Sequence, residues 1–131
     1  MKKIIIDSSI IAEHLTTINA ESVLRKLSRE YFCYTTVFNA IELFAVSKSL
    51  KETQAIEEAM HAMKVLGVNS KSAKNIASIV SYSKNVFCAL IAGVCIESKL
   101  PIITLNAKRF LGINKLKVYS IKELAKRSCM H

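Results

Sequence analysis

Lys3-Ile4-Ile5-Ile6-Asp7-Ser8-Ser9-Ile10-Ile11 is the most informative part of the sequence for the fold class. An apolar run without alternation, such as the one that opens it, is typical of a strand buried on both faces of a parallel sheet. Asp7, the only aspartate in the chain, would then lie at the carboxyl end of that strand, where open α/β sheets bind their ligands. The alternative interpretation is that Asp7 merely caps the helix that the following serines open.

The rest of the chain alternates between strand and helix patterns. Aromatic and β-branched residues predict further strands over residues 31–35, 100–104 and 117–120. Apolar periodicity and caps predict six helical regions. In the first half of the chain they cover residues 13–29, in one or two pieces with a cap at Asn19, then 37–48, and then 49–67, ending at Gly67. In the second half one helix begins at Asn69 or Ser70, one covers residues 86–98, and one begins at Ser120. This alternation predicts one α/β domain over residues 1–131, with a parallel sheet flanked by helices.

Composition narrows the class of protein. A chain of 131 residues with 51% hydrophobic residues and one proline can bury a real core and is not disordered. Its apolar runs are short and interrupted by charge, so we expect neither a membrane span nor a signal peptide, and a cytoplasmic location. A formal charge of +9 favours a polyanionic partner, nucleic acid first and an acidic protein second. The alternative interpretation of this charge is that it only keeps the protein surface solvated, without a polyanionic partner.

Cysteine and histidine spacing indicates no zinc site. The four cysteines (Cys33, Cys88, Cys95 and Cys129) form no C-x-x-C pair and are interpreted as reduced thiols. The three histidines (His14, His61 and His131) are scattered. The three glycines form no phosphate-binding loop, which argues against a nucleotide cofactor. Ser8 and Ser9 have no histidine or lysine at a triad-like spacing, so serine-type hydrolysis is weakly supported.

Three polar residues follow predicted strands and define a candidate site. They are Asp7, Glu42 (one turn into a helix) and Asn106. The carboxyl ends of neighbouring parallel strands meet at one edge, so these side chains are expected to converge. Oxygen ligands of this kind suit Mg²⁺ or Mn²⁺, which can activate water against a phosphodiester. The alternatives are that Glu42 pairs with Asn39 in a capping box, and that Asn106 is a turn or cap residue.

At these positions the chain resembles a known family. The segments Ile4–Ile11, Ala40–Leu43, Ala89–Ala92 and Ile103–Phe110 resemble, in order and spacing, the motifs of the PIN domain. The resemblance runs through nearly the whole chain and is greatest to the small ribonuclease toxins of VapBC toxin–antitoxin pairs. It implies a three-layer α/β/α sandwich, Mg²⁺- or Mn²⁺-dependent cleavage of RNA and, in the toxin branch, a homodimer held by a small antitoxin.

The resemblance also assigns roles to individual residues. It implies that Asp7 and Glu42 bind the metal ion and that Asn106 takes the fourth polar position of the site. Thr104 would order that end of the site, and Ser8 would form hydrogen bonds near the acids. Lys108 and Arg109, which follow Asn106, are candidates for binding the RNA backbone. The alternative for this pair is an ordinary solvated turn.

The third acid of the family pattern is missing. Family members usually carry Asp immediately before the Ala-Leu-Ile-Ala segment, where this chain has Cys88, and no acid lies between Glu58 and Glu97 to replace it. A thiol is a poor ligand for hard cations, so we expect weakened metal affinity and a Cys88 side chain packed under the pocket.

Two hypotheses of function follow. The first is a metal-dependent endoribonuclease that acts as a toxin. The second is a catalytically degenerate PIN domain that binds RNA or a protein partner without cleaving RNA, an alternative that Cys88 favours.

Overall fold

The computed structural model describes residues 2–81 and 83–129, with side chains through residue 126. Five short strands form one sheet in the order β3-β2-β1-β4-β5, with every neighbouring pair parallel. The strands are β1 (Lys3–Ile6), β2 (Phe32–Thr36), β3 (Lys64–Leu66), β4 (Ile102–Ile103) and β5 (Val118–Tyr119). The prediction of a parallel α/β fold is therefore confirmed.

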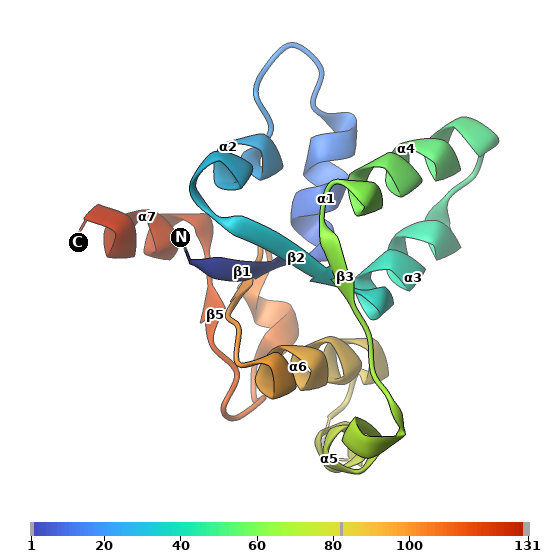
Figure 1. The fold of residues 1–131 in the computed structure, drawn as a ribbon, viewed down its shortest axis with the longest axis vertical. Helices are drawn as coiled ribbons and strands as arrows, with labels where there is room; N and C mark the ends of the chain where they lie inside the picture. The colour runs from blue at the N-terminus through green and yellow to red at the C-terminus, as the bar shows by residue number, and fades with distance from the viewer. Residues whose placement is uncertain (1, 82, 130–131) are drawn as a thin grey trace.

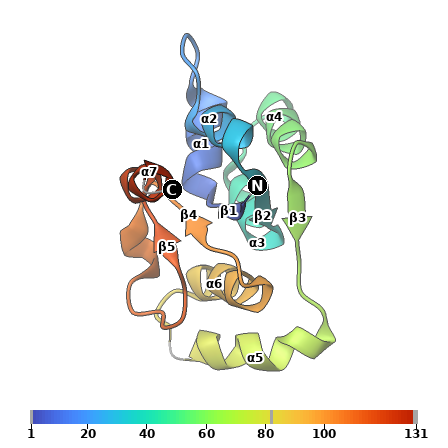
Figure 2. The same cartoon turned by 60° about the vertical axis from the view of Figure 1, so that its left-hand side comes forward.

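Helices cover both faces of this sheet, as Figures 1 and 2 show. They are α1 (Ser8–Thr16), α2 (Val23–Glu30), α3 (Val37–Val46), α4 (Leu50–His61), α5 (Ser70–Ser81), α6 (Val86–Ser98) and α7 (Ile121–Cys129), with the 3₁₀ helix η1 (Ala107–Phe110). Helices α1, α2 and α4 lie on one side of the sheet, α6 lies on the other, and α5 packs on the outside of α6 (Figure 2).

The side chains of β1 show why both faces must be covered. Successive side chains of a strand point to opposite faces. Ile4 and Ile6 pack in the core beneath α1, α2 and α4, whereas Ile5 packs against α6 with Ile91. All three isoleucines of β1 are almost completely buried. The unbroken apolar run thus places Asp7, the next residue, at the carboxyl end of the central strand.

Several predicted elements differ from the structure. Helix α4 ends at His61, and Lys64–Leu66 forms the edge strand β3, so the prediction that Gly67 ends this helix is wrong. A three-residue strand is too short for its pattern to be separated from a helix end. Helix α2 is capped by the side chain of Ser22 and not by Asn19. Asn69 caps α5 through its side-chain oxygen, which accepts from the backbone N–H of Ser72 at 3.0 Å.

Two further predictions concern cysteines and membrane spans. Cys33, Cys88 and Cys95 are free thiols, whereas the side chain of Cys129, like His131, lies outside the described residues. In the described part of the chain, no helix has the length and hydrophobicity needed to cross a bilayer.

Candidate metal and phosphodiester site

Asp7 is the centre of the site. It is fully buried at the start of α1, and its side chain makes no capping hydrogen bond to that helix. Its two carboxylate oxygens instead accept hydrogen bonds from side chains of distant segments. Asn39 Nδ2 lies 3.0 Å from Oδ1, and Thr104 Oγ1 lies 2.7 Å from Oδ2. The hydroxyl of Ser9 adds a third bond, at 3.1 Å from Oδ2. The capping interpretation of Asp7 is therefore wrong for its side chain.

Helix α3 supplies the second carboxylate. Thr36 caps this helix by accepting from the backbone N–H of Asn39. The side chains of Asn39 and Glu42, one turn apart on α3, both form hydrogen bonds with Ser8 of α1. The hydroxyl of Ser8 accepts from Asn39 Nδ2 at 2.8 Å and donates to Glu42 Oε1 at 2.7 Å. Glu42 is thus held toward Asp7 and is not a capping partner of Asn39.

Arg109, on η1, joins the two acids. Its guanidinium donates through Nη1 to Asp7 Oδ1 at 3.2 Å and through Nη2 to Glu42 Oε2 at 2.6 Å. Only 17% of its side chain is exposed. We call Asp7, Glu42 and Arg109 the carboxylate cluster. Two carboxylates from separate elements therefore share one cation, and that cation belongs to the chain itself.

Cys88 lies beside the same guanidinium. It is in the first turn of α6, is 3% exposed, and its sulfur accepts from Arg109 Nε at 3.4 Å. It also belongs to the apolar cluster of Ile5 and Ile91. The sequence predicted an inert residue packed under the pocket, and the structure adds a polar contact to that packing.

The charges of the cluster keep Arg109 protonated. Burial lowers the pKa of Arg109, but the hydrogen bond with Cys88 and the charges of Asp7 and Glu42 together outweigh burial, so the pKa lies above its ordinary value. A guanidinium stays charged at any pH a protein tolerates. The guanidinium of the cluster therefore stays positively charged throughout the physiological range.

The other predicted site residues are placed differently. Thr104 is fully buried, and besides its bond to Asp7 it accepts from the backbone N–H of Asn106 at 3.0 Å. The Asn106 side chain is exposed and makes no capping hydrogen bond. Lys108 is also exposed. Of the residues around η1, the structure therefore brings Thr104 and Arg109 to Asp7, but not the side chains of Asn106 and Lys108.

Two parts of this arrangement go beyond what the sequence predicts. The sequence indicates Asn39 only as a cap, although it bonds both Asp7 and Ser8 and is fully buried. Its position one turn before Glu42 on α3 is the signal that points to this role. For Arg109 the sequence indicates only an RNA-backbone contact or a solvated turn, and no local pattern predicts its contact with an acid 102 positions away.

The donor set fits one hard divalent cation through two carboxylates. Mg²⁺ is usually held by one or two carboxylates together with water and substrate phosphates, and the guanidinium marks a position that both carboxylates reach. These side chains do not form a three-acid site. Among the described residues, no group of three His, Cys, Asp or Glu side chains is placed to hold a metal. Asp7 and Glu42 would hold such an ion, and Cys88 would add no hard ligand.

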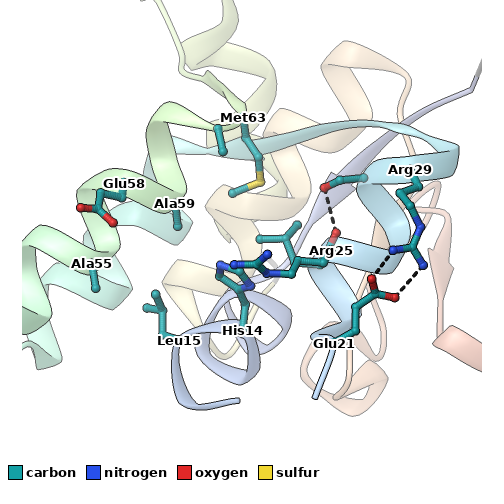
Figure 3. Close-up of a pocket in the computed structure, with 12 residues that line it drawn as sticks. His14, Leu15, Glu21, Arg25, Arg29, Ala55, Glu58, Ala59 and Met63 are labelled. Atoms are coloured by element: carbon teal, nitrogen blue, oxygen red, sulfur yellow. Dashed lines mark hydrogen bonds and ion pairs between the residues drawn. The ribbon is translucent and has the colours of Figure 1, made fainter. Parts of the chain in front are cut away.

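Two of the hollows at the surface of the described residues differ in their relation to the carboxylate cluster. One, of about 790 Å³, borders the carboxylate cluster and is lined by Arg109 together with Lys84, Lys108 and Lys115; we call it the basic groove. The other, of about 510 Å³, lies between α1, α2 and α4. Figure 3 shows Leu15, Ala59 and Met63 among the residues that line it, and the ion pair of Arg29 with Glu21 at its edge. It contains no residue of the carboxylate cluster.

The chain is similar to one known protein family and to several solved structures. The model of the PIN domain family matches residues 4–116. Among solved structures, DNA-bound VapBC from Salmonella typhimurium matches with a TM-score of 0.73 and 17% identity, over 92% of this chain and 98% of the other. A toxin–antitoxin complex from Klebsiella pneumoniae matches with a TM-score of 0.70 and 17% identity, over 91% and 100%.

VapBC2 from Rickettsia felis, bound to a promoter DNA fragment, matches with a TM-score of 0.73 and 16% identity, over 88% of this chain and 96% of the other. No curated protein sequence matches significantly. At these identities the structural matches establish the fold.

Proposed function

The chain belongs to the PIN domain family, and from this premise we propose that it is a divalent-metal-dependent endoribonuclease, the toxin of a toxin–antitoxin pair. The observation that carries the proposal is the convergence of the Asp7 and Glu42 carboxylates on one cation position at the carboxyl end of the sheet. A bound Mg²⁺ or Mn²⁺ there would supply an activated water and neutralise charge on a phosphodiester.

The residues around the two acids prepare them for this task. Thr104, Asn39 and Ser9 hold both oxygens of Asp7 from three different segments of the chain, and Ser8 holds Glu42. Ligands held in this way need no rearrangement when a cation arrives. The basic groove would position the RNA backbone next to them, and the charge of +9 would draw RNA to the protein.

The partner in our proposal is a small antitoxin protein. The structural neighbours from Salmonella typhimurium and Klebsiella pneumoniae are toxin–antitoxin complexes, and the family model covers most of this chain. A partner of this kind would hold the nuclease inactive until the partner is removed. We also propose a cytoplasmic location for the protein.

Asp7→Asn and Glu42→Gln are expected to lower Mn²⁺-dependent RNA cleavage by about a hundredfold or more, since each removes one of two charged ligands. The measurement is the initial rate on several labelled RNAs with Mg²⁺, with Mn²⁺ and with chelator. Glu57→Gln, at an exposed position on α4, is the matched control and should cleave at the wild-type rate. Cleavage that persists in chelator or in Asp7→Asn would contradict the proposed function.

We further propose that the protein is a homodimer whose interface uses exposed apolar residues of α3 and of the start of α4. Ile41, Phe44 and Val46 are apolar but 43%, 38% and 70% exposed, and Leu50, which opens α4, is 74% exposed. An apolar patch of this kind on a small soluble domain is typical of an interface. Val46→Asp is expected to halve the mass measured by light scattering, whereas Ile18→Asp, at an exposed apolar residue outside this patch, should leave it unchanged. A Val46→Asp variant that keeps the dimer mass would exclude this face.

The second candidate function is RNA or protein binding without cleavage. The specific observation in its favour is that Cys88 and Arg109 place a thiol and a guanidinium around the acids. Both candidates predict RNA affinity that falls steeply with salt. Only the nuclease also predicts divalent-dependent cleavage, so wild-type protein that binds several RNAs and cleaves none would favour the second candidate.

A further inference from the structure

We propose that Arg109 is a built-in competitor for the metal, closing the Asp7–Glu42 site until a phosphodiester in the basic groove takes its guanidinium. The inference rests on the proposed function for the identity of the cation site, and it adds how that site is regulated. The protein would then assemble its metal site only in the presence of nucleic acid.

The first step is that Arg109 and a divalent ion cannot share the site. All three guanidinium nitrogens are engaged: Nη1 with Asp7, Nη2 with Glu42 and Nε with Cys88. An ion bound to both carboxylates would lie within a few Å of this positive charge. Like charges this close repel strongly in a partly buried site, where water screens them less than in bulk solvent. One cation must therefore leave before the other binds.

The second step is that Arg109 has somewhere to go. Its side chain is 17% exposed and lines the basic groove, where the side chains of Lys84, Lys108 and Lys115 are exposed. A guanidinium binds phosphate in the same two-pronged geometry in which it binds carboxylate. A phosphodiester in the groove would therefore offer Arg109 an equivalent partner, and the neighbouring lysines would hold that phosphodiester in place.

The third step concerns Cys88. The thiol does not compete for a hard cation, but its sulfur accepts from Arg109 Nε and so helps to seat the guanidinium. The ring of Phe110, 5.2 Å from the guanidinium carbon, supports the same position. Cys88, which replaces the third acid, and Phe110 thus both favour the closed state.

The test measures Mn²⁺ binding, by the electron paramagnetic resonance of free Mn²⁺, for the wild-type protein and Arg109→Gln. Removing the competing charge is expected to tighten binding roughly tenfold or more. Lys122→Gln, which removes one exposed charge on α7, is the control for net charge and should bind as the wild type does. A 2′-O-methyl RNA oligonucleotide should tighten Mn²⁺ binding by the wild type and not by Arg109→Gln.

Each outcome decides the proposal. Equal Mn²⁺ affinity of the wild type and Arg109→Gln would overturn the competition, and a wild type indifferent to the oligonucleotide would overturn the release by phosphodiester. Circular dichroism checks the fold, and Arg109→Met, which keeps the apolar stem, replaces the Gln variant should it not fold. Tight Mn²⁺ binding by Arg109→Gln without RNA cleavage would contradict the nuclease while leaving the competition intact.

Discussion

The double variant Cys88→Asp, Arg109→Gln is expected to cleave RNA roughly a hundredfold faster than the wild type at limiting Mn²⁺, because it adds a third carboxylate and removes the competing cation. The Cys88→Asp change alone should gain little. Its new carboxylate would lie next to Arg109 Nε, now 3.4 Å from the Cys88 sulfur, and would hold the guanidinium more firmly. The measurement is the initial cleavage rate of both single variants, the double variant and the wild type across a Mn²⁺ series.

The matched control is Cys88→Asn, Arg109→Gln, which has the shape of the first double variant without the third charge. It should behave as Arg109→Gln does. A first double variant no faster than Arg109→Gln would show that a third carboxylate adds nothing once Arg109 is removed, which would contradict the expected gain.

Asn39→Ala is expected to lower the free energy of unfolding by about 2–4 kcal/mol, because it removes several buried hydrogen bonds at once. Asn39 is fully buried and donates to Asp7 and Ser8, and its oxygen accepts from Thr36 Oγ1 at 2.8 Å. Among the described residues, no buried side-chain nitrogen or oxygen lacks a partner. The variant would leave Thr36 without its acceptor and Asp7 with one donor fewer.

Urea denaturation with a fitted slope measures this loss. Asn75→Ala, at an exposed position on α5, is the control and should change stability by less than about 0.5 kcal/mol. An Asn39→Ala midpoint equal to that of Asn75→Ala would mean that the polar network beneath the two acids adds no stability.

The central strand and the positions at its carboxyl end could be predicted from the sequence because both depend on local patterns. The unbroken run Ile4–Ile6 has only one stable place, the middle of a sheet covered on both faces. Asp7 and Thr104 then follow neighbouring strands β1 and β4, which are paired in parallel, so their meeting is a consequence of topology.

The positions of Arg109 and Asn106 could not be predicted in the same way. Asn106 and Arg109 are three residues apart, and which of them faces Asp7 depends on how η1 is oriented after β4. The sequence favoured Asn106 for its chemistry, whereas the structure turns Arg109 inward and leaves Asn106 exposed. A pair of opposite charges 102 positions apart has no periodicity by which to find it.

The most direct test of the shared cation site is a crystal structure of Arg109→Gln grown with Mn²⁺, with anomalous data collected at the manganese edge. We expect one anomalous peak within coordination distance of both Asp7 and Glu42. Crystals that show no peak between these carboxylates, or a peak bound only elsewhere, would contradict it.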